Sequence, residues 1–164
     1  MNSRHTLAAA GVVAILAAPV RAQAPAAPQA DDPVRTLVGR LDLERYKNTI
    51  KGLAQFGDRM QGTQRNRDAI AWLEQQLKSF GYTNVVRQRF QSAIGELENV
   101  YATKVGDTTP GEMYIVSAHM DGRGEGQAAD DDASGCALVL ELARVLASPG
   151  VKTNRSVRFI FWNN

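Results

Sequence analysis

One unit of this sequence narrows the possible folds more than any other: a β-type run, a leucine-rich helical run and a second, strongly apolar β-type run. The first run covers residues 112–118, the helical run covers residues 133–147, and the last covers residues 156–162. A strand, a helix and a second strand in succession favour a parallel crossover of right-handed sense. The sequence therefore predicts an α/β fold with a mixed, mostly parallel sheet and helices on both faces.

The segment before this unit predicts two amphipathic helices. Asp42 is suited to cap the first, which ends near Gly57, and Gly81 occupies the stop position of the second. The apolar residues that recur at helical spacing are Leu43, Tyr46, Ile50 and Leu53 in the first helix, and Ile70, Leu73, Leu77 and Phe80 in the second. We assign no chemistry to either helix.

Two further β-type runs cover residues 85–90 and 99–105. The turn-rich linker 106–111 predicts that residues 99–105 and 112–118 form an antiparallel hairpin. Only Asn163 and Asn164 follow the last strand. We therefore expect a fragment in which that strand lacks covering neighbours and exposes unpaired edge and apolar surface.

The first 22 residues have the layout of a secretory signal. Arg4 supplies a positive charge, residues 7–20 are apolar but too few to span a bilayer, and Ala22 is a small residue at the cleavage position. A buried hydrophobic helix is the alternative, which the Ala/Pro/Gln composition of residues 23–30 disfavours. We predict a signal peptide over residues 1–22, a linker and N-terminal lead-in over 23–40, and a folded domain over 41–164. The location expected is secreted or periplasmic, with no stable membrane anchor after cleavage.

Charge and cysteine content exclude several classes of function. Without the predicted signal peptide, Lys and Arg fall from 19 to 17, equal to the 17 Asp and Glu. A neutral chain with no basic run is a poor binder of nucleic acid. Cys136 is the single cysteine, so no intramolecular disulfide can form, and its apolar surroundings predict a buried structural thiol rather than a nucleophile.

The residues that carry chemistry follow the run at 112–118. His119, the single histidine outside the predicted signal peptide, ends that run, and Asp121 comes two residues later. A glycine-rich loop then leads to three consecutive aspartates, residues 130–132, where the next helix opens. An imidazole with carboxylates is a ligand set for zinc or a similar ion. Three adjacent carboxylates need a helix N-terminus, solvent or a cation to offset their repulsion.

Each of these residues also has a structural interpretation. Asp132 can cap the helix while Asp130 and Asp131 are solvated, and a histidine at a strand end is more often a hydrogen-bonded structural residue. A calcium-binding loop is disfavoured, because the alternating acids and the distal glutamate of such loops are missing from the sequence. Residue by residue, the structural interpretation stays open beside the metal-binding one.

Together, these segments resemble the bacterial leucyl aminopeptidase and glutamate carboxypeptidase family of co-catalytic two-zinc exopeptidases. Three segments carry the resemblance in order: Ser-Ala-His-Met-Asp at 117–121, Ala-Ala-Asp-Asp-Asp-Ala-Ser-Gly at 128–135, and Arg-Phe-Ile-Phe-Trp at 158–162. Residues 59–63 and 80–82 are similar to the N-terminal region of that family as well. Residues 41–164 would then be the N-terminal part of a zinc exopeptidase catalytic domain.

The resemblance implies a role for each site residue. His119 would be a terminal ligand of one zinc ion, Asp131 the carboxylate that bridges two zinc ions, and Asp121 an acid behind His119 that orients its ring. It also implies a cis peptide bond between Asp131 and Asp132, a peptide substrate, and hydrolysis at the peptide N-terminus. The glutamate pair that follows the last strand in that family, and its further Asp and His ligands, have no counterpart in this sequence. We therefore expect the chain itself to be inactive.

Two other functions stay open at this stage. A glutaminyl cyclase-like transferase uses the same fold with a single zinc ion, and a non-catalytic binding domain can keep the scaffold after losing ligands. Retention of both His119 and Asp131 counts against the non-catalytic domain. The sequence decides neither between aminopeptidase and carboxypeptidase specificity nor on an oligomeric state.

Overall fold

The structure is a computed structural model that describes residues 32–124 and 126–163. Its elements are α1 (Pro33–Val38), α2 (Leu43–Ala54), α3 (Gln64–Ser79), β1 (Val86–Ser92), β2 (Gly95–Lys104), β3 (Thr109–His119), the π-helical turn η1 (Ala129–Ala133), α4 (Ser134–Ala147) and β4 (Arg155–Trp162). The predicted signal peptide lies outside the described residues. The predicted lead-in contains a short helix, α1, which the sequence analysis missed and which Asp32 caps.

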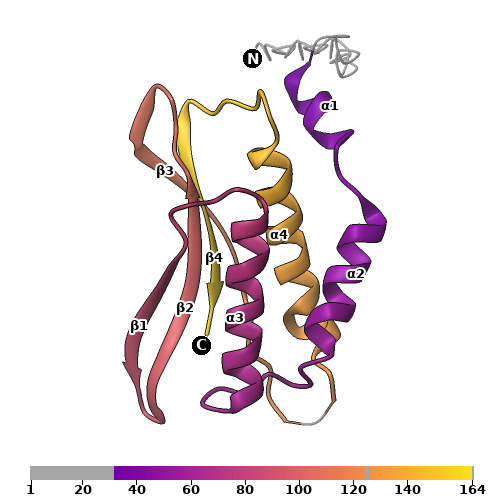
Figure 1. Ribbon diagram of the computed structural model, residues 1–164, viewed down its shortest axis with the longest axis vertical. Coiled ribbons are helices and arrows are strands. Elements are labelled where there is room, and N and C mark those ends of the chain that lie inside the picture. Colours follow the sequence, from indigo (N-terminus) through magenta and orange to yellow (C-terminus); the bar gives the residue numbers. More distant parts are fainter. Residues whose placement is uncertain (1–31, 125, 164) are drawn as a thin grey trace, which may run out of the picture. The chain divides into compact units, whose positions relative to one another are not determined.

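The sheet has four strands in the order β1-β2-β4-β3 (Figure 1). Strands β3 and β4, which flank α4 in the sequence, run parallel as predicted. Pairs β1–β2 and β2–β4 are antiparallel. The mixed α/β class is confirmed, whereas the expectation of a mostly parallel sheet is wrong for the described strands.

The predicted hairpin between β2 and β3 is also wrong, because β4 lies between these two strands. The linker after β2 runs alongside the start of β4 instead, where the Asp107 amide donates to the Thr153 carbonyl at 2.8 Å. A Cβ atom at Gly106 would come within 2.4 Å of the Arg155 backbone, so this crossing has room only for glycine. Strand β4 is thus an inner strand rather than the exposed one expected, and β1 and β3 form the sheet edges among the described strands.

Helix α2 packs against α4 and η1, while helices α3 and α4 cover one face of the sheet (Figure 1). They pack against side chains of alternate strand positions, which are Val100 and Ala102 of β2, Ala118 of β3, and Phe159 and Phe161 of β4. Ile115, which points to the other face, stays 60% exposed. The prediction of helices on both faces is therefore not met within residues 32–124 and 126–163.

Local chemistry sets the ends of α2 and α3 where the sequence predicts them. The Asp42 carboxylate accepts hydrogen bonds from the amides of Glu44 at 2.9 Å and Arg45 at 3.1 Å. Gly81 follows α3 with a φ of 95°, a conformation that side chains disfavour. Both helices accordingly begin and end within a few residues of the expected positions.

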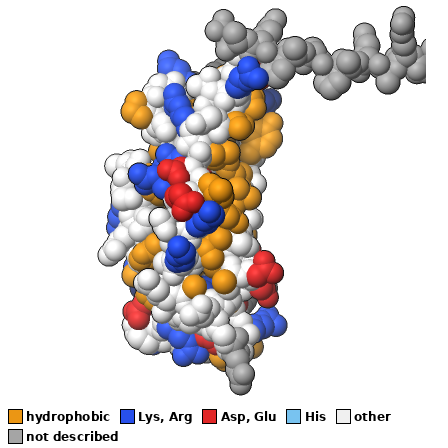
Figure 2. All heavy atoms as spheres, turned by 90° about the vertical axis from the view of Figure 1, so that its right-hand side faces the viewer, with side chains coloured by type: hydrophobic (Ala, Val, Ile, Leu, Met, Phe, Trp, Pro, Cys, Tyr) orange, Lys and Arg blue, Asp and Glu red, His pale blue; other side chains and the backbone are white. Residues whose placement is uncertain are grey.

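Figure 2 shows the face that carries α2, where a band of hydrophobic side chains lies beside clustered acidic and basic ones. Exposed large apolar residues of the helices are Val34, Val38, Leu43 and Leu138. None of the helices in the described ranges combines the length and the apolar character needed to cross a membrane.

Glu141 of α4 connects this helix to the start of α2. Its carboxylate accepts the Asp42 amide at 2.7 Å and the Arg144 guanidinium at 2.5 and 2.9 Å. Burial alone would raise the pKa of Glu141, but these hydrogen bonds hold the pKa below its ordinary value. The ionised carboxylate is therefore the form that stabilises this contact.

We expect Glu141→Gln to lower the free energy of unfolding by about 1–3 kcal/mol at neutral pH, because a charge-assisted buried contact is lost. Since the folded-state pKa is depressed, this contribution is complete above the ordinary carboxyl pKa and is lost as pH falls through the folded value. Chemical denaturation at neutral pH and at about pH 3 measures both effects. Glu44→Gln, at an exposed position of α2, is the control. A loss of the same size at both pH values would contradict the assignment.

Candidate metal centre

His119 is held by the backbones of two neighbouring strands. It ends β3, and its register partner across the parallel pair is Trp162, the last residue of β4. The Met120 amide donates to the Trp162 carbonyl at 2.7 Å. The imidazole is 37% exposed, so its ring reaches the surface at the carboxyl end of the β3–β4 pair.

The three consecutive aspartates have three different surroundings. Asp131 and Asp132 depart from helical backbone angles within η1, and the peptide bond between them is cis, as predicted. Asp132 turns back to accept the Gly135 amide at 2.9 Å, the capping role the sequence suggests. Asp130 contributes its backbone carbonyl to the Ser134 hydroxyl at 2.9 Å. Asp131 alone reaches toward His119, and its side chain is 86% exposed.

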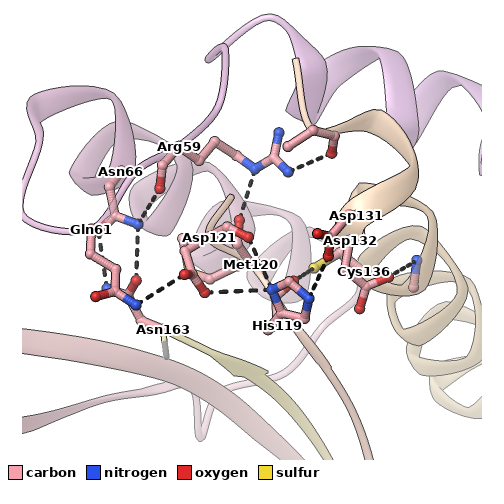
Figure 3. Close-up of polar contacts among 12 residues, drawn as sticks. Arg59, Gln61, Asn66, His119, Met120, Asp121, Asp131, Asp132, Cys136 and Asn163 are labelled. Atoms are coloured by element: carbon pink, nitrogen blue, oxygen red, sulfur yellow. Dashed lines mark hydrogen bonds and ion pairs between the residues drawn. The ribbon is translucent and has the colours of Figure 1, made fainter. Parts of the chain in front are cut away.

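His119 and Asp131 converge, as the sequence analysis expects. Their Nε2 and Oδ1 atoms are 2.9 Å apart (Figure 3). On the other side of the ring, Nδ1 lies 3.0 Å from the backbone carbonyl of Asp121 and 3.6 Å from its carboxylate. The roles of the three residues at a metal ion stay a prediction.

Asp121 orients the His119 ring more through its main chain than the sequence implied. Because a carbonyl oxygen only accepts, the contact with Asp121 requires the proton of His119 to be on Nδ1. The buried carboxylate of Asp121 accepts the Gln61 amide at 3.0 Å. Main chain and side chain of Asp121 thus connect the ring to the loop after α2.

The donor chemistry of this pair fits a cation. With the proton on Nδ1, a neutral ring turns its Nε2 lone pair toward the Asp131 carboxylate. The Nε2 lone pair and the lone pairs of the carboxylate repel each other. A metal ion between them, or a second proton on the ring, would offset this repulsion. Neutral imidazole and carboxylate are both zinc ligands. His119 and Asp131 are therefore the residues that would hold zinc.

These two donors fit part of a zinc site. A tetrahedral site needs four ligands. Among residues 32–124 and 126–163, no group of three or more His, Cys, Asp and Glu side chains is arranged to hold a metal ion. The described residues therefore supply one side of such a site and do not complete it.

Cys136 supports His119 from behind. Its side chain is buried, and Sγ donates to the His119 carbonyl at 3.3 Å. Burial raises the pKa of the Cys136 thiol well above its ordinary value. The prediction of a buried structural thiol is confirmed.

Sequence analysis missed a buried polar group around the site. The side-chain amides of Asn66 in α3 and Asn163, which follows β4, exchange two hydrogen bonds of 3.0 Å each. The backbone N–H of Asn163 donates to the Asn99 side chain at 2.8 Å. Arg59 and Gln61 lie next to them (Figure 3). The similarity of residues 59–63 to a known family was the one signal that pointed to this segment, and it assigned no role to any side chain.

Comparison with known proteins supports a zinc metallopeptidase relationship. The family model for peptidase family M28 matches residues 99–164, the range that holds β3, β4 and both candidate ligands. A protein of Pyricularia oryzae described as a probable zinc metalloprotease is 29% identical over 151 residues, which cover 74% of this chain and 29% of that protein. The chain therefore spans less than a third of the length of this relative.

Solved structures share the fold. An aminopeptidase from Aneurinibacillus sp. strain AM-1 superimposes with a TM-score of 0.70 at 19% identity, covering 79% of this chain and 64% of that structure. A glutaminyl cyclase from Porphyromonas gingivalis gives a TM-score of 0.65 at 22% identity, covering 76% of this chain and 48% of that structure. At these identities the similarity shows a shared α/β fold.

The buried position of Cys136 predicts slow thiol chemistry. We expect an aromatic disulfide reagent to react with the folded chain at least about tenfold more slowly than with the chain in concentrated guanidinium chloride, because the thiol is buried and its pKa is raised. Absorbance of the released thiolate measures both rates. Equal rates in the folded and the unfolded chain would show that the Cys136 thiol is not buried, which would contradict its structural role.

Proposed function

We propose that this chain is part of a zinc exopeptidase of peptidase family M28, an aminopeptidase that removes N-terminal residues from peptides. The family-model match and the similarity to a probable zinc metalloprotease support the metallopeptidase class. The aminopeptidase type and the leucyl aminopeptidase and glutamate carboxypeptidase branch rest on the sequence resemblance. The observation that carries the proposal is the 2.9 Å approach of His119 Nε2 to the Asp131 carboxylate.

The side chains of this chain would bind and orient. His119 offers the Nε2 lone pair, and the contact of Nδ1 with the Asp121 carbonyl stops the ring from turning. Asp131 has two carboxylate oxygens in an exposed position, so it is able to serve two ions. Zinc ions held by these residues would supply Lewis acidity for hydrolysis. Asp132 accepts the Gly135 amide at 2.9 Å, so we assign it the role of helix cap and not that of ligand.

The proposal extends to the location of the protein, its substrate and its metal content. A signal peptide over residues 1–22, and with it a secreted or periplasmic location, stays a prediction. The peptide substrate and the second zinc ion are likewise part of the proposal. We assign the role of general base to none of the described residues.

A glutaminyl cyclase-like transferase is the second function considered. The glutaminyl cyclase similarity is at 22% identity, which carries the fold alone. No described residue of this chain favours the cyclase over the peptidase. We therefore retain hydrolysis as the proposed reaction.

The ligand assignment predicts a selective effect among adjacent aspartates. In millimolar zinc we expect the thermal unfolding midpoint of the chain to rise by about 2 °C, because a weak site stabilises only when the ion is in excess. Asp131→Asn and His119→Ala should each abolish this rise. Asp130→Asn is the matched control and should retain it. The assignment of His119 and Asp131 as zinc ligands would be contradicted if Asp130→Asn lost the zinc-induced rise. It would also be contradicted if both Asp131→Asn and His119→Ala retained that rise.

The incomplete ligand set predicts that the chain by itself is inactive. We expect the purified chain to show no turnover of an aminoacyl chromogenic substrate in the presence of zinc, and to hold well under one equivalent of zinc after dialysis. The reason is that one imidazole and one carboxylate are too few for a tight site. Metal analysis and absorbance measure the two quantities. Chelator-sensitive turnover with stoichiometric zinc would show that the residues of this chain suffice.

A further inference from the structure

Arg59 is completely buried, with 0% of its surface exposed. Within the described residues, its guanidinium makes five hydrogen bonds, and all five end on backbone carbonyl oxygens. The acceptors are Met120 at 2.8 Å, Leu53 at 3.2 Å, Gly57 at 3.0 Å, Gln127 at 2.9 Å and Ala128 at 2.8 Å. Arginine spreads five N–H donors over a rigid plane, more than any other side chain offers; here Nη1 serves three of the carbonyls, and Nε and Nη2 serve one each.

Three of these five acceptors lie in the segments that carry the two candidate ligands. Met120 is adjacent in sequence to His119, at the end of β3. Gln127 and Ala128 immediately precede η1, which carries Asp131. The other two carbonyls belong to the end of α2 and the turn after it. Arg59 therefore connects the two sides of the candidate metal site through one planar group (Figure 3).

We propose that Arg59 is a positioning residue that fixes the separation between the His119 segment and the Asp131 segment, so that Nε2 and the carboxylate meet. The consequence for metal binding rests on the proposed function. The positioning itself does not, because it concerns the distance between two backbone segments.

Two features show that this connection tolerates little change. The Arg59 backbone has a φ of 51° and its carbonyl accepts the buried Asn66 amide at 2.9 Å, which holds the residue from its other end. At Gly122, between the two segments, a Cβ atom would come within 2.5 Å of both the Ala128 Cβ and the Asp58 carbonyl. The loops on either side of the guanidinium are thus in direct contact, and the arginine sets their spacing from within.

Amide hydrogen exchange tests the positioning without any metal. Arg59→Lys keeps the charge but has three donors for five acceptors. The reporters are the amide of Ala133, bonded to the Ala128 carbonyl at 3.3 Å, and the amide of Gly135, bonded to Asp132 at 2.9 Å. We expect both to exchange at least about tenfold faster relative to the amides of α3, because the segment opens locally.

Tyr82→Phe is the matched control. It also removes a buried hydrogen bond from a side chain to a backbone carbonyl, that of Ala143 at 2.9 Å, but the acceptor lies late in α4. The ratio of Ala133 and Gly135 exchange to α3 exchange should stay within about twofold of the unsubstituted chain. If Arg59→Lys gives the uniform change expected of a purely structural residue, the proposal is overturned.

Gly122→Ala provides a second route that keeps every donor of Arg59. The added methyl group pushes the loop against Ala128 and Asp58, so we expect the same local acceleration at Ala133 and Gly135. Should Arg59→Lys prevent folding, this variant decides. Unchanged or uniform exchange in Gly122→Ala would overturn the claim that the spacing of the two segments governs the site.

Zinc-induced thermal stabilisation links the inference to the metal. We expect the rise in unfolding midpoint to be lost in Arg59→Lys and kept in Tyr82→Phe. A chain that shows no zinc effect at all would count against the proposed function, while the exchange data would still decide the role of Arg59. A zinc effect that survives in Arg59→Lys beside faster local exchange would show that the spacing does not serve metal binding.

Discussion

The insertion of β4 between β2 and β3 is the constraint on which the rest of the structure depends. Phe159 and Phe161 of this strand are fully buried under the helices, and they fill the centre of the core. The strand also positions the site, because its last residue, Trp162, pairs with His119 and accepts the Met120 amide. Asn163 continues from the same strand into the buried amide pair with Asn66. Core packing and site geometry thus share one strand.

The sequence predicted the features that local chemistry determines. The Asp42 cap, the stop at Gly81 and the parallel pairing of β3 with β4 each follow from neighbouring residues or from a short crossover. The β2–β3 hairpin failed for a long-range reason. A strand some fifty residues later in the sequence is more apolar than either partner, and it took the place between them because hydrophobic burial outweighs short loop closure.

The site shows the same division. Strand-end placement and family resemblance were enough to bring His119 and Asp131 forward as a pair, and the structure places them in contact. The buried arginine could not be found in this way. A fully buried Arg59 with carbonyl acceptors depends on five residues scattered over three segments, and no spacing in the sequence encodes that arrangement. Arginine side chains are mostly exposed in folded proteins, so the residue type alone predicts an exposed position for Arg59 rather than the buried one observed.

The candidate site combines an exposed ligand pair with a buried support. The Asp131 carboxylate is 86% exposed and keeps its hydration, so no buried charge is left uncompensated when the pair stands without an ion. Arg59, Asp121 and Cys136 lie beneath it, shielded from solvent, where hydrogen bonds are electrostatically stronger than in water. An arriving cation would have to displace water from the carboxylate, but the ring and the two backbone segments are already ordered. The entropic cost of ordering the two ligand-bearing segments therefore arises during folding, and it does not weaken the later binding of an ion.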